Sequence, residues 1–179
     1  DNSRPVKSSD VYDIASITKV VASTLSLMKL DDEGKFDLDA PLANYFSEIP
    51  AGSTYFNMQP RRMLAHVAGL KPWIPFYIET VDDGKPDADI YSSASSELYP
   101  RQVAHNMYIK ESVSDSLFDR ILETPLRKNR DYKYSDLGYY FIKEIIGRRG
   151  NQPLNLFADQ NFYGPLGLQT MGYLPLERF

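Results

Sequence analysis

The sequence predicts a mainly α-helical chain that forms a single domain. Two segments, 20–30 and 137–146, carry apolar residues on nearly all sides, as helices buried in a core do. Prolines and capping residues at helix starts, and glycines at helix ends, mark several shorter helices around them. A chain of 179 residues with 42% hydrophobic content is long enough to bury one core, so we expect one domain or a compact part of one.

The composition argues against several classes of protein. A net charge of −4 disfavours nucleic acid as the main partner. The chain has no cysteine, so it has neither a disulfide framework nor a thiolate metal site, and its histidines, His66 and His105, are far apart in the sequence. No apolar run is long enough to span a bilayer, and the first residues show no signal-peptide pattern. We therefore expect no metal, no cofactor and no membrane span.

The first predicted helix, about 15–33, places a serine and a lysine on one face. It begins close to Ser16 and ends at Gly34, and Lys19 follows Ser16 by one turn. The Ser16 hydroxyl would then lie near unpaired backbone amides at the positive end of the helix dipole. Burial and the helix terminus both lower a lysine pKa, so Lys19 can act as the general base that a serine nucleophile requires. This geometry predicts acyl transfer through Ser16.

The spacing of these two residues is weak evidence when taken alone. A Ser-x-x-Lys match is expected about once by chance in a chain of this size. A second match, Ser26 and Lys29, lies in the middle of the same predicted helix, where no free amides are available to hold an oxyanion. On spacing alone, the favoured interpretation is structural, with Ser16 as the helix N-cap and Lys19 as a solvated residue of the first turn.

Short helices and a long loop are predicted in the middle of the chain. The helices cover about 39–45 and 59–66, where an aspartate and a proline mark their starts. Prolines, glycines and a serine run interrupt 71–98, and so long a loop in a compact domain is usually functional or mobile. Three aromatic residues at its start line a substrate cleft or anchor the loop to the core; they are Trp73, Phe76 and Tyr77.

The remaining elements are all predicted to be helices. The first two cover about 101–108 and 114–123, and the second of these has its apolar residues on one face. The next covers about 135–148, with Ser135 or Asp136 as its cap and an apolar surface dense enough for the core. The last covers about 153–162 and is broken by the glycines and proline that follow it.

Three stretches, taken in order, resemble the motifs of one superfamily. Residues 15–20 read Ala-Ser-Ile-Thr-Lys-Val, residues 63–70 read Met-Leu-Ala-His-Val-Ala-Gly-Leu, and residues 134–139 read Tyr-Ser-Asp-Leu-Gly-Tyr. They are similar to the nucleophile motif, the leu-leu-x-his-x-x-gly-leu block and the tyr-x-asn motif of the serine β-lactamase and penicillin-binding protein superfamily. Within it, the chain looks like the class C-type β-lactamase-related or esterase branch. The resemblance covers almost the whole chain from Val11 onward.

The resemblance implies a catalytic role for three residues and a substrate-binding role for a fourth. Ser16 would be the acylated nucleophile, Lys19 its proton partner, and Tyr134 a base or proton shuttle whose phenol lies near Lys19. Asp136 stands at a substrate-binding position where the superfamily often has asparagine. A carboxylate there keeps an acceptor, loses a donor and adds charge, which leaves acyl substrates other than β-lactams open. His66 is interpreted as structural, bonding the backbone at a turn.

Two expected parts of the superfamily's fold are not found in the sequence. No lys-thr-gly-like or his-x-gly-like strand motif follows Tyr134, and the chain begins too close to Ser16 to hold the strand hairpin that usually precedes it. We therefore expect the helical region of the superfamily's α+β fold with most of the antiparallel sheet absent, as a single partial domain over residues 1–179. This predicts a fragment of a larger hydrolase, whose bare helix surface is exposed or covered by another copy of the chain.

Three functional classes follow from the residues and the resemblance. The first is a serine hydrolase that acts through a Ser16 acyl-enzyme on an ester, amide or β-lactam, although the fragment alone is expected to be inactive. The second is a catalytically silent relative that binds cell-wall peptide or glycan. The third is an accessory module attached to a larger bacterial glycoside hydrolase, and so to further domains of the same chain. The resemblance places all three outside the cytoplasm of a bacterium, in the periplasm or secreted.

Overall fold

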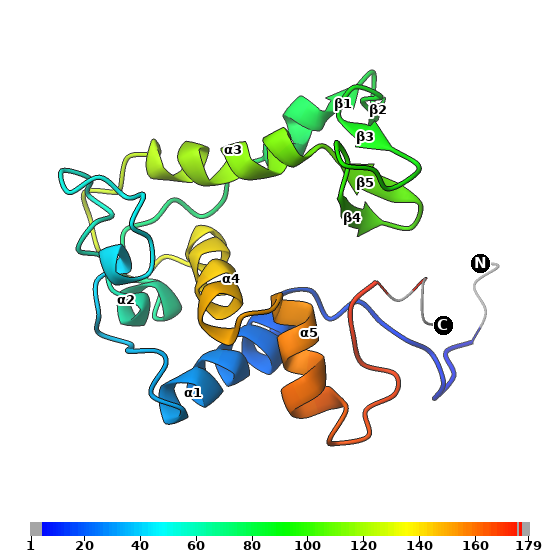
Figure 1. Cartoon of the computed structure of the whole chain (residues 1–179), viewed down its shortest axis with the longest axis horizontal. Helices are drawn as coiled ribbons and strands as arrows, with labels where there is room; N and C mark the ends of the chain where they lie inside the picture. The colour runs from blue at the N-terminus through cyan, green and yellow to red at the C-terminus, as the bar shows by residue number, and fades with distance from the viewer. Residues whose placement is uncertain (1–4, 175, 177–179) are drawn as a thin grey trace.

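The computed structural model describes residues 5–174 and 176. Its helical elements are η1 (Ala15–Ile17), η2 (Lys19–Thr24), α1 (Leu25–Asp32), η3 (Leu42–Asn44), α2 (Pro60–Leu64), η4 (Phe76–Thr80), α3 (Glu111–Leu122), α4 (Leu137–Gly150), α5 (Leu154–Ala158) and η5 (Asp159–Tyr163). Its strands are β1 (Val81–Asp82), β2 (Lys85–Pro86), β3 (Tyr91–Ser92), β4 (Arg101–Ala104) and β5 (Met107–Ile109). Figure 1 shows α4 in the middle, with α1 and α5 below it and α3 with the strands above it in this view.

Helix α4 is the centre of the core because its apolar residues surround most of its circumference. It packs against α1, α2 and α5. Gly138 lets α2 come close, since a Cβ at this position would lie 3.0 Å from the Cβ of Met63. The helix ends at Asn151, which has a left-handed φ of 53°, a conformation that asparagine tolerates better than most residues. The buried side chains of α4 are Leu137, Phe141, Ile142, Ile145 and Ile146.

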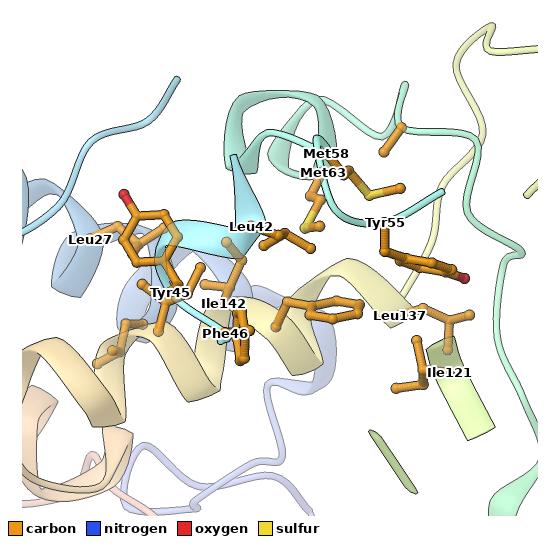
Figure 2. Close-up of a cluster of buried hydrophobic side chains, with 14 of the residues drawn as sticks. Leu27, Leu42, Tyr45, Phe46, Tyr55, Met58, Met63, Ile121, Leu137 and Ile142 are labelled. Atoms are coloured by element: carbon orange, nitrogen blue, oxygen red, sulfur yellow. The ribbon is translucent and has the colours of Figure 1, made fainter. Parts of the chain in front are cut away.

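An aromatic cluster joins α4 to segments from both halves of the chain. The ring of Phe141 meets Phe118 of α3 edge to face at 5.0 Å between centroids, and Phe46 in the same way at 5.7 Å. Tyr55 adds a third ring at 5.8 Å, and its hydroxyl donates a hydrogen bond to the Thr124 carbonyl. Figure 2 shows two of these rings, Phe46 and Tyr55, beside α4. The cluster fixes α3 and the 42–58 region relative to the helix that follows the candidate site.

The helical segment over residues 15–32 changes its winding along its length. It begins as the 3₁₀ turn η1, widens into the π-helical η2 and continues as α1. In the wide part, the Thr24 hydroxyl donates to the carbonyl of Lys19 at 2.9 Å. Such π-helical insertions are rare and often lie at functional sites. Here the π-helical winding begins at the lysine that the Ser-x-x-Lys spacing singles out.

Two small antiparallel sheets correct the predicted fold class. The prediction of a mainly α chain was wrong, because about 40% of the chain is helical and 8% is strand, and its structural neighbours belong to a mixed α/β class. β1 and β2 form a hairpin, and a three-stranded sheet has the order β3-β5-β4. The sheets lie within 81–109, where the sequence predicts a loop and then a helix.

The predicted helix at about 101–108 is the β4–β5 hairpin. Gln102 pairs with Tyr108, and the chain turns at Asn106, which has a φ of 49°. Tyr91 of β3 pairs with Ile109 from the other side. The strands are two to four residues long, too short for a period-2 pattern to emerge, and β3 finds its partner only after a long excursion. Local periodicity could therefore not reveal this sheet.

Part of the first helical segment leaves apolar side chains in solvent. Ile17 is 59% exposed and Val20 is 60% exposed. The expected bare helix surface is therefore present, while its cover by a second copy stays a prediction. Within residues 5–174 and 176, no helix combines the length and apolar character needed to cross a membrane.

Candidate active site

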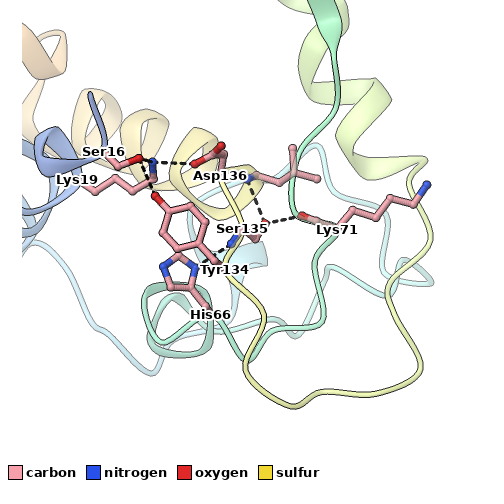
Figure 3. Close-up of polar contacts among 8 residues, drawn as sticks. Ser16, Lys19, His66, Lys71, Tyr134, Ser135 and Asp136 are labelled. Atoms are coloured by element: carbon pink, nitrogen blue, oxygen red, sulfur yellow. Dashed lines mark hydrogen bonds and ion pairs between the residues drawn. The ribbon is translucent and has the colours of Figure 1, made fainter. Parts of the chain in front are cut away.

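Ser16 is contacted by one neighbouring and one distant side chain, and a third polar side chain pairs with its lysine neighbour. Lys19 Nζ donates a hydrogen bond to Ser16 Oγ at 3.0 Å, and the Tyr134 hydroxyl donates to the same oxygen at 2.8 Å across a separation of 118 residues. Asp136 Oδ1 pairs with Lys19 Nζ at 2.7 Å. Figure 3 shows this arrangement at the start of α4. The structure thus brings together all four residues that the sequence analysis assigns to the site.

The backbone before Ser16 holds this serine at an exposed turn. Ala15 has a φ of 44°, a left-handed conformation that costs a residue with a Cβ roughly 1–2 kcal/mol. The Ala15 amide donates to Asp13 Oδ1 at 2.7 Å, which stabilises the turn. Ser16 follows in η1, where first-turn amides lack acceptors within the helix. The side chain of Ser16 is exposed, and the amides on either side of it already donate to Asp13 Oδ1 and to the carbonyl of Ile14.

Lys19 is held as a cation. Burial lowers its pKa, but the hydrogen bonds and charge interactions with Asp136 and Tyr134 outweigh burial, and the net pKa is raised above 10.5. Its Nζ also lies over the rings of Tyr134 and Tyr139, at 5.3 and 5.4 Å from their centroids. The prediction of a lowered lysine pKa was wrong, because it did not include the Asp136 carboxylate. In this state Ser16 Oγ accepts from two donors and has no free base beside it.

Hydrogen bonds that involve main-chain groups hold the 134–136 segment against the 66–72 segment. The Ser135 amide donates to Nδ1 of His66 at 3.1 Å, and the Ser135 hydroxyl donates to the carbonyl of Lys71 at 2.6 Å. The Asp136 amide donates to the carbonyl of Pro72 at 2.8 Å. These bonds position the side chains on either side of Ser135. The sequence analysis named Ser135 only as a possible helix cap and missed its hydrogen bonds to His66 and Lys71, because bonds that involve the main chain leave no residue pattern.

The ring of His66 packs against the ring of Tyr134. Its Nδ1 accepts a backbone hydrogen bond, so the neutral ring carries its proton on Nε2, and the ring centroid lies 4.5 Å from that of Tyr134. The residue has a left-handed φ of 57°. Burial, and then the Lys19 charge, lower the pKa of His66 below 6.5. The interpretation of His66 as a structural residue that bonds the backbone at a turn agrees with this geometry.

The neutral state of His66 predicts a pH dependence of stability. The unfolded chain takes up this proton at a higher pH than the folded chain, so the free energy of unfolding should fall as the pH drops below 6.5. His66→Asn keeps an acceptor for the Ser135 amide and suits the left-handed backbone, but does not titrate. We measure the free energy of unfolding by urea at several values between about pH 5 and 7.5. We expect this free energy to depend less steeply on pH in the variant than in the natural sequence. If the free energy of unfolding depends on pH equally in the two proteins, groups other than His66 cause that dependence.

The second Ser-x-x-Lys match has no access to a substrate. Ser26 is fully buried in α1, and its hydroxyl has no hydrogen-bond partner among the described residues. Lys29 pairs instead with Glu33, at 2.9 Å. This agrees with the sequence argument that the middle of a helix is unsuitable for an acyl transfer site. The pair therefore serves as an internal control for experiments on Ser16 and Lys19.

Two cavities border the site. The nucleophile cavity, about 450 Å³, is lined by Ser16, Lys19 and Lys143, and also by Asp136 and Tyr140. The aryl pocket, about 370 Å³, lies beside it, and its lining includes the three aromatic residues at the start of the predicted loop; they are Trp73, Phe76 and Tyr77. Within the described part of the chain, no group of His, Cys, Asp or Glu side chains is placed to hold a metal ion.

The chain belongs to the Beta-lactamase family, which it matches over residues 1–178. This confirms the resemblance to the serine β-lactamase and penicillin-binding protein superfamily. Among curated relatives, a Salmonella typhimurium protein described as "Putative D-alanyl-D-alanine carboxypeptidase" is 27% identical over 175 residues, which covers 94% of this chain and 35% of that protein. The chain thus spans about a third of the length of the curated relatives it matches.

Solved structures share the fold. A D-amino acid amidase from Ochrobactrum anthropi SV3, complexed with D-phenylalanine, superposes with a TM-score of 0.63 at 22% identity, covering 99% of this chain and 44% of the amidase. An octameric penicillin-binding protein homologue from Pyrococcus abyssi gives a TM-score of 0.60 at 19% identity, covering 88% of this chain and 31% of the homologue. These likenesses support the mixed α/β class in place of the predicted mainly α class.

Proposed function

We propose that this chain is the nucleophile-bearing part of a serine hydrolase that acts through an acyl-enzyme on Ser16. The observation that carries the proposal is the position of Ser16 Oγ, within hydrogen-bond distance of both Lys19 Nζ and the Tyr134 hydroxyl. A serine becomes a nucleophile when an adjacent group takes its proton, and these are the two groups in contact with it. Membership of the Beta-lactamase family supports the same chemistry.

Lys19 and Tyr134 would act as one proton-carrying pair. Since the Lys19 pKa is raised, the pair must first release one proton to solvent before it can accept the proton of Ser16. Oγ then attacks the substrate carbonyl carbon, and the backbone amide of Ser16 stabilises the resulting oxyanion. The pair returns the proton to the leaving group as the bond to the carbonyl breaks, which leaves the acyl group on Ser16. Water would then attack the carbonyl carbon of the acyl group while the pair takes its proton. The bond to Ser16 Oγ would break, the proton would return to this oxygen, and the acyl group would leave as a carboxylic acid.

Asp136 sets the pH at which this pair becomes active. Its hydrogen bond and its charge both raise the Lys19 pKa, so Asp136→Asn should lower that pKa. The active form then appears at lower pH, and the acid limb of the acylation rate plotted against pH should move to lower pH. Asp119→Asn, an exposed change on α3, is the matched control and should leave the limb in place. A limb that stays fixed or moves upward in Asp136→Asn would contradict this role.

The relatives suggest where substrates should be sought. One is named for a D-alanyl-D-alanine carboxypeptidase and another for a D-amino acid amidase, so amides of D-amino acids join esters and β-lactams as candidate substrates. A carboxypeptidase of that name would act on cell-wall peptide, which supports a bacterial location outside the cytoplasm. We include both the candidate substrates and the location outside the cytoplasm in the proposal for this chain.

The test is the intact mass of the chain after incubation with benzylpenicillin and, separately, with p-nitrophenyl acetate. The sequence alone predicts an inactive fragment, but because Ser16 Oγ contacts both Lys19 and Tyr134 in the structure, we expect a mass increase equal to the acyl group in the natural sequence and none in Ser16→Ala. Ser26→Ala removes the hydroxyl of the second Ser-x-x-Lys match and should leave the adduct unchanged. Equal labelling of the natural sequence and Ser16→Ala would show that the acyl group goes elsewhere and would rule out the proposal.

A second candidate is a silent relative that binds peptide or glycan without turnover. One observation favours it, since the ion pair with Asp136 keeps Lys19 protonated. This candidate predicts ligand binding that is unaffected by Ser16→Ala and no covalent adduct at any pH. The hydrolase predicts an adduct that forms faster as the pH rises. The pH series of the adduct experiment therefore separates the two.

A further inference from the structure

We propose that Tyr139 is a positioning residue whose ring face holds the Lys19 ammonium group beside Ser16. This inference rests on the proposed function and names the side chain that places its proton carrier. Tyr139 lies in the first turn of α4, and Lys19 Nζ lies over its ring, 5.4 Å from the centroid. The face of an aromatic ring carries partial negative charge, so it attracts a cation at this distance.

Tyr139 is better packed than the other groups that contact this ammonium. The Asp136 side chain is 46% exposed and Tyr134 is 39% exposed, so water competes for both. Tyr139 is instead half-buried and packs against the main core cluster. Its amide donates to the carbonyl of Asp136 at 2.9 Å, and its ring centroid lies 6.0 Å from that of His66. The ring therefore offers Lys19 a contact that is fixed by the core.

The hydroxyl of Tyr139 interacts with the helical turn that carries Lys19. Burial raises the pKa of Tyr139 above 10.0, and hydrogen bonding with Thr24 and the charge of Lys19 offset only part of this rise. The phenol therefore stays neutral near pH 7. The Thr24 hydroxyl in turn donates to the carbonyl of Lys19 at 2.9 Å, within the π-helical η2. Tyr139 is thus connected to Lys19 twice, directly at the ammonium group and through Thr24 at the main chain.

The ring also adds to the groups that keep Lys19 protonated. Burial lowers the Lys19 pKa, but Asp136 and Tyr134 raise it by more. An aromatic face attracts the ammonium form and not the neutral amine, so the Tyr139 ring should raise this pKa further. The other titratable side chains around Lys19 come from α4, from the residues just before it and from the 66–72 segment; they are Asp136, Tyr134, Tyr140, Lys143 and His66. All of them stay unchanged in the variants compared below.

The test compares Tyr139→Phe, which keeps the ring, with Tyr139→Leu, which removes it. Lysine that is isotope-labelled at Cε reports the Lys19 pKa by NMR, and the Lys19 signal is identified by its absence from Lys19→Met. We expect the Lys19 pKa in Tyr139→Leu to lie about 0.5–1 unit below that in Tyr139→Phe, the shift that corresponds to one contact between a cation and a ring. The signal of Lys29, which pairs with Glu33 at 2.9 Å, is the internal reference.

Equal Lys19 pKa values in the two variants, or a higher value in Tyr139→Leu, would overturn the proposal. If Tyr139→Leu does not fold, pentafluorophenylalanine at position 139 takes its place. Fluorination keeps the approximate shape of the phenylalanine ring but reverses the charge on its face, so the ring would repel the ammonium group. The Lys19 pKa should then fall below that in Tyr139→Phe, and a value that does not fall would overturn the proposal in the same way.

Acylation of the same variants by p-nitrophenyl acetate separates this inference from the proposed function. A lower Lys19 pKa produces the active form at lower pH, so the acid limb of the acylation rate should lie at lower pH in Tyr139→Leu than in Tyr139→Phe. The maximal rate in Tyr139→Leu should be lower by about tenfold or more, because Lys19 is no longer held beside Ser16. Equal maximal rates in the two variants would overturn the positioning role. A lowered Lys19 pKa without any acylation, or with an acid limb that does not move, would count against the proposed function alone.

Discussion

Replacing Lys19 with methionine is expected to slow the acylation of Ser16 by about 10²- to 10⁴-fold, the range of general acid–base contributions. Methionine keeps most of the length of the side chain but has no proton to carry and no charge to pair with Asp136. Ser16 Oγ would retain Tyr134 as a contact, at 2.8 Å, but the proton-carrying pair would be broken. The measurement is the rate of adduct formation with p-nitrophenyl acetate, followed by intact mass.

Lys29→Met is the matched control for this variant. It changes the lysine of the second Ser-x-x-Lys match, which pairs with Glu33 and does not contact Ser16. Acylation in this control should proceed at the rate of the natural sequence. Because the Asp136 side chain is 46% exposed, water can solvate it once Lys19 is gone, so Lys19→Met should still fold. A folded Lys19→Met protein that acylates at the normal rate would remove Lys19 from the mechanism.

Replacing Phe141 with alanine is expected to lower the free energy of unfolding by about 3–5 kcal/mol. The side chain is fully buried, and its ring contacts Phe46, Tyr55 and Phe118. Alanine would leave a cavity where α3 and the 42–58 region meet α4. Urea unfolding of the two proteins measures the difference.

Tyr12→Ala is the control for the loss of an aromatic ring. Tyr12 is 61% exposed, so its removal should change the free energy of unfolding by no more than about 0.5 kcal/mol. If Phe141→Ala costs no more than Tyr12→Ala, the aromatic cluster is not the centre of the core. A loss in the expected range would show that this aromatic cluster is central to the stability of the core.

The sequence predicted those parts of the fold that one segment determines by itself. The helical turns over 15–32 and the helix α4 follow from dense apolar runs with clear ends. The i, i+3 relation of Ser16 and Lys19 likewise needs no information from elsewhere in the chain. Tyr134 was found through the superfamily motif, since no local pattern predicts a contact across 118 residues.

The errors arise where distant segments meet. The three-stranded sheet was missed because β3 pairs with β5 through strands of two and three residues. The Lys19 pKa was predicted with the wrong sign because the Asp136 carboxylate approaches from the start of α4. The Ser135–His66 bond and the position of Tyr139 under Lys19 also depend on this packing. The spacing and the superfamily motif together predicted Ser16 as the nucleophile, whereas its electrostatic setting could be described only from the fold.

The most direct measurement is the location of the acyl group after incubation with p-nitrophenyl acetate, by fragment mass mapping of the protein. We predict that the added mass lies on the fragment that contains Ser16, and that this fragment stays unmodified in Ser16→Ala. An acyl group on Tyr134, on a lysine or on Ser26 in the natural sequence, with Ser16 unmodified, would contradict the assignment of Ser16 as the nucleophile.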